Sequence, residues 1–155
     1  MIDEQTAIQR LMIHEGLKLM PYRDSLGKLT IGVGRCIDTN PFTEQEKTAV
    51  GDWRHGITRN AAIMLLKNDI RRCRDELNHW NWYHELNDTR QYALLDMDFQ
   101  LGLKKLKQFK KMLAALEAKD FETAHNECLN SVYAKQTPTR AERIAKAIKT
   151  GVWEC

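Results

Sequence analysis

Three side chains within one short segment have the chemistry needed to hydrolyse an acetal such as a glycosidic bond. They are Glu15, Asp24 and Thr30. A carboxylic acid can protonate the departing oxygen, while an ionised carboxylate and a hydroxyl can hold water or stabilise a developing oxocarbenium charge. Residues 14–35 therefore form the first candidate site, and the elements around them must bring these groups together.

Glu15 extends the apolar stripe of a helix that we predict over 6–15. Apolar side chains precede it by seven, four and three positions, at Ile8, Leu11 and Met12, and this spacing turns the carboxylate toward the interior. Loss of water there favours the neutral acid that a proton donor needs. Thr6 is the expected cap of this helix, and Gly16 suits a left-handed position at its end.

A short hairpin is expected after this helix. Residues 22–24 and 29–33 have the pattern of two strands, with the turn region 25–28 between them. Asp24 lies where the hairpin begins to turn, and Thr30 lies on the returning strand. Asp24 should therefore stay more hydrated than Glu15, and two carboxyl groups in unlike environments can divide acid and base work.

The segment resembles the catalytic segment of phage-type lysozymes. The residues that carry the resemblance are Glu15-Gly16-Leu17, Tyr22-x-Asp24, Gly27 and Thr30-Ile31-Gly32-Val33-Gly34. The resemblance implies a muramidase, a glycoside hydrolase that cleaves the β-1,4 bond between N-acetylmuramic acid and N-acetylglucosamine in peptidoglycan. It makes Glu15 the acid, with Asp24 and Thr30 positioning water in a reaction that inverts the anomeric carbon. It implies no cofactor.

Three further positions are expected at the site through the same resemblance. Phe99 and Gln100 fall in a Phe-Gln-x-Gly signature with which the family lines its cleft, so they are candidate substrate contacts. Arg140 falls in a segment similar to the family's Gln-Thr-Pro-x-Arg-Ala-x-Arg, where the first arginine pairs with the catalytic glutamate. Cys36 occupies a position that helps to hold substrate in the family, and here its contact is expected through the backbone.

Arg35 stands where the family has a histidine after Gly-x-Gly. In the family that histidine pairs with an aspartate on a connecting helix, and the aligned residue here is Asp69. We therefore predict an ion pair between Arg35 and Asp69 that stays charged through neutral pH. The chain between residues 36 and 57 is shorter than in the T-even phage enzyme, so the small lobe is expected to be reduced.

The predicted fold class is α+β, mainly helical and lysozyme-like. Apolar residues at 63, 66, 70, 73 and 77 predict a helix over 58–78. We expect a single domain over 1–155, in which that helix connects a small β lobe (16–57) to a helical lobe (79–155), with the 6–15 helix packing near the cleft. The helical lobe should contain helices starting at Asn87 or Asp88, over 106–116, over 121–129 and from Thr137 to about Gly151.

Two surface features have alternative interpretations. The aromatic run over 79–84 is a core plug or, less favoured, a platform on which sugar rings stack. The basic face of the 106–116 helix is a solvated surface or a docking surface for an anionic cell envelope. Its members are Lys104, Lys105, Lys107, Lys110 and Lys111.

Composition excludes some classes of protein and sets expectations about location. The chain has 155 residues, a formal net charge of +3 and 43% hydrophobic residues, which fits a globular fold and argues against a histone-like binder of nucleic acid. It has no signal peptide pattern and no apolar run of membrane-spanning length. We expect a monomer without stable membrane insertion, in the host cytoplasm before release and acting on peptidoglycan in the periplasm. A separate membrane-permeabilising protein would then give it access to the wall.

The four cysteines do not predict a metal site. Cys36, Cys73, Cys128 and Cys155 have neither Cys-x-x-Cys spacing nor a nearby pair of histidines. Reduced thiols are the expectation for a cytosolic protein, and a disulfide formed later in an oxidising periplasm is the alternative.

Two other function classes compete with the muramidase. A peptidoglycan-binding module without catalysis has little reason to keep a glutamate, an aspartate and a threonine in one segment. A helical nucleic-acid binder would account for the basic helices, but the sequence lacks a basic stripe with interleaved aromatic residues.

Overall fold

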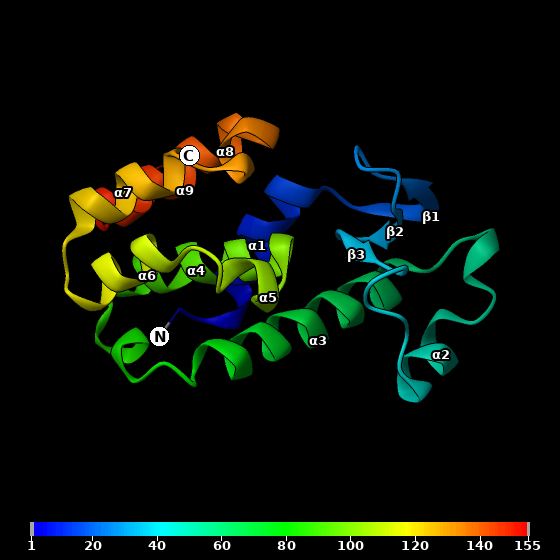
Figure 1. Cartoon of the computed structure of the whole chain (residues 1–155). Helices are drawn as coiled ribbons and strands as arrows, with labels where there is room; N and C mark the ends of the chain where they lie inside the picture. Colours follow the sequence, from blue (N-terminus) through cyan, green and yellow to red (C-terminus); the bar gives the residue numbers. More distant parts are fainter. Residues whose placement is uncertain (1, 155) are drawn as a thin grey trace. The chain divides into compact units, whose positions relative to one another are not determined.

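The computed structural model describes residues 2–154, and their contacts divide the chain into two compact units. We call residues 4–71 the sheet unit; residues 2–3 with 72–154 form the helical unit (Figure 1). The boundary falls within α3 (Arg59–Leu77), the helix predicted over 58–78. Helices dominate and the strands form one small antiparallel sheet, so the predicted α+β, mainly helical fold class is confirmed.

The sheet unit begins with α1 (Glu4–Glu15). The chain then forms β1 (Lys18–Arg23), β2 (Leu29–Gly32) and β3 (Arg35–Cys36), antiparallel in the order β1-β2-β3. A hairpin is present, but β1 begins at Lys18 rather than at Tyr22 and ends at Arg23, so Asp24 lies in the turn. β3 was not predicted, because two residues are too few for an alternating pattern. After β3 come α2 (Glu44–Val50), the 3-10 turn η1 (Trp53–His55) and the start of α3.

The start of α1 corrects one prediction. The helix begins at Glu4, so Thr6 lies inside it rather than at its cap. The preceding chain is anchored, because the Ile2 side chain is buried and its carbonyl accepts a hydrogen bond from Arg74 at 2.5 Å. Glu4 in the first turn also interacts favourably with the helix dipole.

The sheet unit has its own apolar core. Ile31 of β2 is fully buried at its centre, and the partly buried ring of Trp53 packs against this cluster. The other buried members come from α2, from α3 and from the segment between them: Val50, Ile57, Ala61, Ala62 and Leu65. This core fixes β2, and therefore Thr30, against the first turns of α3.

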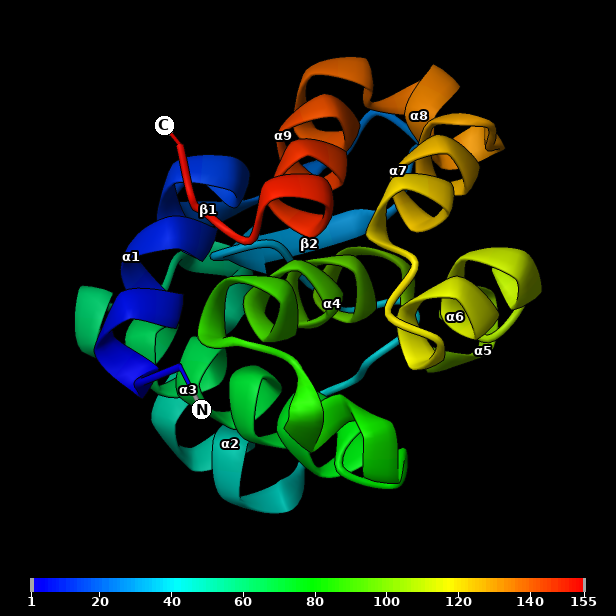
Figure 2. The same ribbon diagram turned by 90° about the vertical axis from the view of Figure 1, so that its left-hand side faces the viewer.

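The helical unit is built around α4 (Asp88–Leu101), which buries every residue from 91 to 98. Asn87 caps α4, accepting a hydrogen bond from the Arg90 amide at 2.9 Å. α9 (Pro138–Thr150) packs against α4 and α7 (Phe121–Leu129), as Figure 2 shows. The remaining elements are η2 (Asn81–Glu85), α5 (Leu103–Leu106), α6 (Lys110–Glu117) and α8 (Val132–Gln136).

Two differences from the predicted helices occur in this unit. The helix expected over 106–116 begins later than predicted: α5 ends at Leu106 and α6 starts at Lys110, because Phe109 leaves helical geometry and its ring packs edge-on against Tyr133. The short helix α8 was not predicted. The predicted helix over 121–129 matches α7, and Gly151 ends α9 in the left-handed conformation.

The aromatic run over 79–84 combines a buried ring with a half-buried pair. Tyr83 is buried, and its hydroxyl donates a hydrogen bond to the Gln91 carbonyl at 3.2 Å. This ring therefore fills the core, as the favoured interpretation of the run predicts. Trp80 and Trp82 stack on each other with ring centroids 5.3 Å apart. Within residues 2–154, no helix combines the length and apolarity needed to cross a membrane.

Candidate active site

The turn between β1 and β2 is organised by Asp24. Its Oδ1 accepts hydrogen bonds from the Leu26 and Lys28 amides, both at 2.9 Å. The Asp24 amide donates to the Lys28 carbonyl at 3.0 Å, and its carbonyl accepts from Gly27 at 2.9 Å. Aspartate favours such turns because its short side chain bonds the backbone two or more residues on. Both side-chain bonds use Oδ1, so no contact within residues 2–154 keeps Oδ2 from water or a substrate hydroxyl.

Thr30 lies at the centre of a row across the three strands. It faces Tyr22 on β1 and Cys36 on β3. The Thr30 side chain is buried, and its hydroxyl donates to the Lys28 carbonyl at 2.9 Å. Because that bond uses the hydroxyl proton, the oxygen lone pairs are left to accept a hydrogen bond.

Glu15 and Asp24 both act on one tyrosine of this row. Burial raises the pKa of Tyr22 above its usual value, and the negative charges of Glu15 and Asp24 raise it further. The phenol therefore lies within electrostatic reach of both carboxylates, and Thr30 is its direct cross-strand neighbour. The three predicted catalytic residues thus all lie in the sheet unit, where Thr30 pairs with Tyr22 across the strands and the two carboxylates act on the Tyr22 phenol.

The Glu15 side chain packs directly against the backbone of Gly34. A methyl group added at Gly34 would clash with Oε2 of Glu15 and would lie 2.7 Å from its Cδ. Gly34 also has a φ of +64°, which side-chain-bearing residues rarely adopt. The half-buried Glu15 carboxylate, at the end of α1, is therefore held against the backbone that joins β2 to β3.

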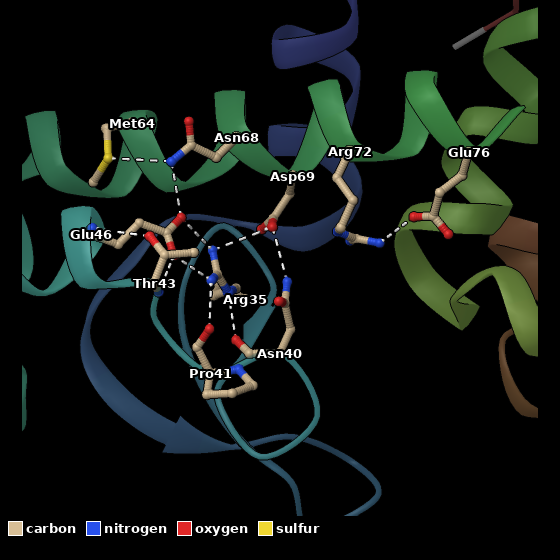
Figure 3. Close-up of polar contacts among 10 residues, drawn as sticks. All are labelled: Arg35, Asn40, Pro41, Thr43, Glu46, Met64, Asn68, Asp69, Arg72 and Glu76. Carbon is tan, nitrogen blue, oxygen red and sulfur yellow. Dashed lines mark hydrogen bonds and ion pairs between the residues drawn. The ribbon is translucent and has the colours of Figure 1, made fainter. Parts of the chain in front are cut away.

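Arg35 follows Gly34 directly and is anchored in a buried network (Figure 3). The predicted ion pair with Asp69 is confirmed, with Nη1 and Oδ1 3.3 Å apart. A closer partner, Glu46, was not predicted. Its carboxylate accepts hydrogen bonds from Nη2 and Nη1 of Arg35 at 2.6 and 3.1 Å. The guanidinium also donates to the carbonyls of Asn40 at 2.8 Å and Pro41 at 3.2 Å.

Glu46 satisfies several donors at once. Its carboxylate accepts from the Thr43 amide at 2.9 Å, which closes the capping box of α2, and from Asn68 of α3 at 2.9 Å. The exposed fractions of Arg35 and Glu46 are 3% and 2%. Although burial raises the Glu46 pKa, the bonds from Arg35, Asn68 and Thr43 outweigh it and hold the pKa at about 2. The network ties β3, α2 and α3 to a single guanidinium.

A sequence signal for Glu46 existed. Thr43 and Glu46 have the spacing of a capping box, and a glutamate at that position is already turned back toward the chain. The sequence did not reveal that this glutamate is buried, because α2 has only seven residues and a weak pattern.

The remaining predicted site residues lie in the helical unit. Nε2 of the half-buried Gln100 donates to Thr137 Oγ1 at 3.1 Å, and its Oε1 is a buried acceptor with no donor among residues 2–154. Phe99 is half-buried beside it on α4. The roles of Phe99, Gln100 and Cys36 in binding substrate stay predictions.

Arg140 is held by an aspartate that its sequence pattern did not predict. Its Nε donates to Asp96 Oδ1 at 2.8 Å, and Oδ2 of the fully buried Asp96 accepts from the Tyr92 hydroxyl at 2.7 Å. The Tyr92 ring packs edge-on against Trp153, with centroids 5.0 Å apart. Through these contacts the guanidinium of Arg140, on α9, is held against α4. Its pairing with Glu15 stays a prediction.

Comparison with known proteins gives consistent matches over most of the chain. The phage lysozyme family model matches residues 12–145. "Probable T4-type lysozyme 2" of Dictyostelium discoideum is 31% identical over 91% of this chain and 92% of its own length. "Probable T4-type lysozyme 1" of the same organism is 28% identical with the same coverage. The "Pre-baseplate central spike protein Gp5" of Enterobacteria phage T4 is 33% identical over 88% of this chain, which spans 26% of that protein.

Replacing Glu46 by glutamine should destabilise the protein at neutral pH and not at low pH. The Glu46 pKa falls from 4.5 to about 2 on folding, which corresponds to about 3 kcal/mol of stability. A lowered carboxyl pKa stabilises the folded state above the unfolded pKa, and this contribution is lost as pH falls toward 2. The free energy of unfolding in urea at several pH values measures the difference between wild type and Glu46→Gln.

Glu44→Gln is the matched control, because Glu44 lies on the same helix but is 89% exposed and pairs with Lys47 at the surface. It should change stability little. A Glu46→Gln penalty that is equal at pH 7 and pH 2.5 would contradict the assigned ionisation of Glu46.

Proposed function

The chain belongs to the phage lysozyme family, and we propose that it hydrolyses the β-1,4 bond between N-acetylmuramic acid and N-acetylglucosamine in peptidoglycan. Membership makes it a muramidase-type lysozyme, a glycoside hydrolase. The observations that support the proposed mechanism are that Glu15 packs against Gly34 just after β2, that Thr30 lies on β2, and that Asp24 organises the turn leading into β2.

Glu15 is the proposed general acid. Its proton passes to the glycosidic oxygen as the bond from that oxygen to the anomeric carbon breaks. The contact with Gly34 supports this role, because it restricts the positions that the carboxyl group can take. A proton donor gains from such restriction, since small displacements of a reacting group lower the rate steeply.

Asp24 and Thr30 are proposed to position the attacking water. Thr30 Oγ1 already donates to Lys28, so it can accept a hydrogen bond from the water. Asp24 Oδ1 is held by two amides, so Oδ2 can accept the proton that the water loses on attack. The water oxygen bonds to the anomeric carbon from the face opposite the leaving group, which inverts its configuration.

The helical unit is proposed to add contacts to the glycan. Gln100 has a buried Oε1 that can accept from a sugar hydroxyl or amide, and Phe99 lies beside it on the same helix. Arg140, fixed by Asp96, is proposed to pair with Glu15 and to favour its charged form after proton transfer.

We further propose that the protein lyses host cells at the end of phage growth. It would act as a monomer on the periplasmic cell wall after a separate protein permeabilises the inner membrane. The modest net charge of +3 supports attraction to anionic envelope polymers.

Replacing Glu15 by glutamine should reduce hydrolysis at least about 100-fold, because the amide cannot donate the required proton. Asp24→Asn should cause a loss of similar size while preserving the turn, since the amide oxygen can accept the same two backbone bonds. The measurement is release of reducing ends from purified Gram-negative peptidoglycan, with identification of the residue at the new end. Glu4→Gln, on the same helix as Glu15, serves as control. Wild-type rates in Glu15→Gln would exclude Glu15 as the acid.

Gly34→Ala should lower the rate by about 100-fold by displacing the Glu15 carboxylate. Gly51→Ala is the matched control, because Gly51 has a similar φ of +55° but no neighbour within 4 Å. In both variants an alanine must adopt a positive φ, which strains the backbone. Only in Gly34→Ala does the new methyl group also clash with Glu15. Initial rates per folded molecule separate the two effects, and equal activity of both variants would refute the proposed contact.

A further inference from the structure

A second group of reactive side chains lies in the helical unit, apart from the residues assigned to hydrolysis. Cys73 and Glu76 stand one turn apart on α3, and Asp98 lies on α4. The Cys73 sulfur and one carboxylate oxygen from each acid all lie within 4.8 Å of one another. Cys73 and Asp98 are fully buried, while Glu76 is partly exposed.

The Asp98 carboxylate is the unusual member of this group. Neither of its oxygens is exposed or has a hydrogen-bond partner of good geometry among residues 2–154. The Cys73 thiol acts on it as a weak donor, and burial together with the Glu76 charge raises the Asp98 pKa to about 7. Buried carboxylates are normally satisfied by several donors or by a cation. This one lies beside a thiol and a second carboxylate, and the Arg72 charge only partly offsets the rise in its pKa.

We propose that Cys73, Glu76 and Asp98 bind a zinc ion. Zinc takes thiolate and carboxylate ligands together, whereas calcium and magnesium prefer sites made of oxygen alone. Three protein ligands leave a fourth tetrahedral position for water. On binding, the protons of the Cys73 thiol and of the Asp98 carboxyl group pass to solvent.

The geometry requires only a small adjustment. With Zn–S near 2.3 Å and Zn–O near 2.1 Å, tetrahedral ligand atoms lie roughly 3.5 Å apart, so the group must close by about 1 Å. Glu76 is partly exposed and can move toward the buried pair. Arg72 Nη1 donates a hydrogen bond to Glu76 Oε1 at 2.6 Å (Figure 3). The other oxygen of Glu76, Oε2, can therefore serve as the metal ligand.

The local charge also fits a divalent cation. The three deprotonated ligands and the Arg72 guanidinium together carry two negative charges, which one zinc ion neutralises. The ion would link the last turns of α3 to α4 immediately before Phe99 and Gln100. Its role is therefore to stabilise the helical unit.

Titration of the metal-free protein with Zn²⁺ and Co²⁺ tests the proposal. Calorimetry should give a one-to-one Zn²⁺ complex, and the unfolding temperature should rise with Zn²⁺. Co²⁺ should produce the absorption band of a cobalt–thiolate bond. Cys73→Ala should abolish that band, and Glu76→Gln should weaken Zn²⁺ binding at least about tenfold.

Cys128→Ala is the matched control, because Cys128, like Cys73, is a fully buried cysteine of the helical unit. It should keep the band and the affinity. Failure of the wild-type protein to bind either metal would overturn the proposal, and so would a cobalt–thiolate band that persists in Cys73→Ala. Neither result depends on hydrolytic activity, so the test is independent of the proposed function.

Discussion

The buried contact between Arg35 and Glu46 is the interaction on which the architecture of the sheet unit depends. One guanidinium joins β3 to the carboxylate that caps α2 and to Asp69 of α3, and it also bonds two loop carbonyls. Arg35 is adjacent to Gly34, whose backbone lies against the Glu15 side chain. The position of the proposed acid therefore depends on charges that do not take part in the reaction. Because the pair is buried, removing one partner is costly, as an uncompensated charge would remain.

The helical unit also buries two carboxyl groups in the middle of α4. α4 buries Asp96 and Asp98 two residues apart, and the two have opposite surroundings. Asp96 is satisfied by Arg140 and Tyr92, whereas Asp98 faces the Cys73 thiol and Glu76. One carboxylate therefore fixes a guanidinium, and the other is suited to a cation from solution.

The sequence predicted the elements with strong local signals and missed contacts set by tertiary packing. The Glu15–Thr30 spacing, the glycine after α1, the Asn87 cap and the Arg35–Asp69 pair were all accessible from residue types and from the family resemblance. The burial of Glu46 and of Asp96 was not accessible, because it depends on contacts with elements distant in the chain. The start of α1 was misplaced because Thr6 has the residue type of a cap, whereas the helix begins at Glu4. The helix predicted over 106–116 begins only at Lys110 because Phe109 packs against Tyr133.

The role of the Arg35 network in positioning Glu15 is tested by the rate of peptidoglycan hydrolysis by Glu46→Gln, under conditions where circular dichroism shows the variant to be fully folded. If the Arg35 network holds Gly34 against Glu15, the folded variant should hydrolyse peptidoglycan markedly more slowly than Glu44→Gln and wild type. A fully folded Glu46→Gln protein with the wild-type rate would show that the acid is positioned without this network.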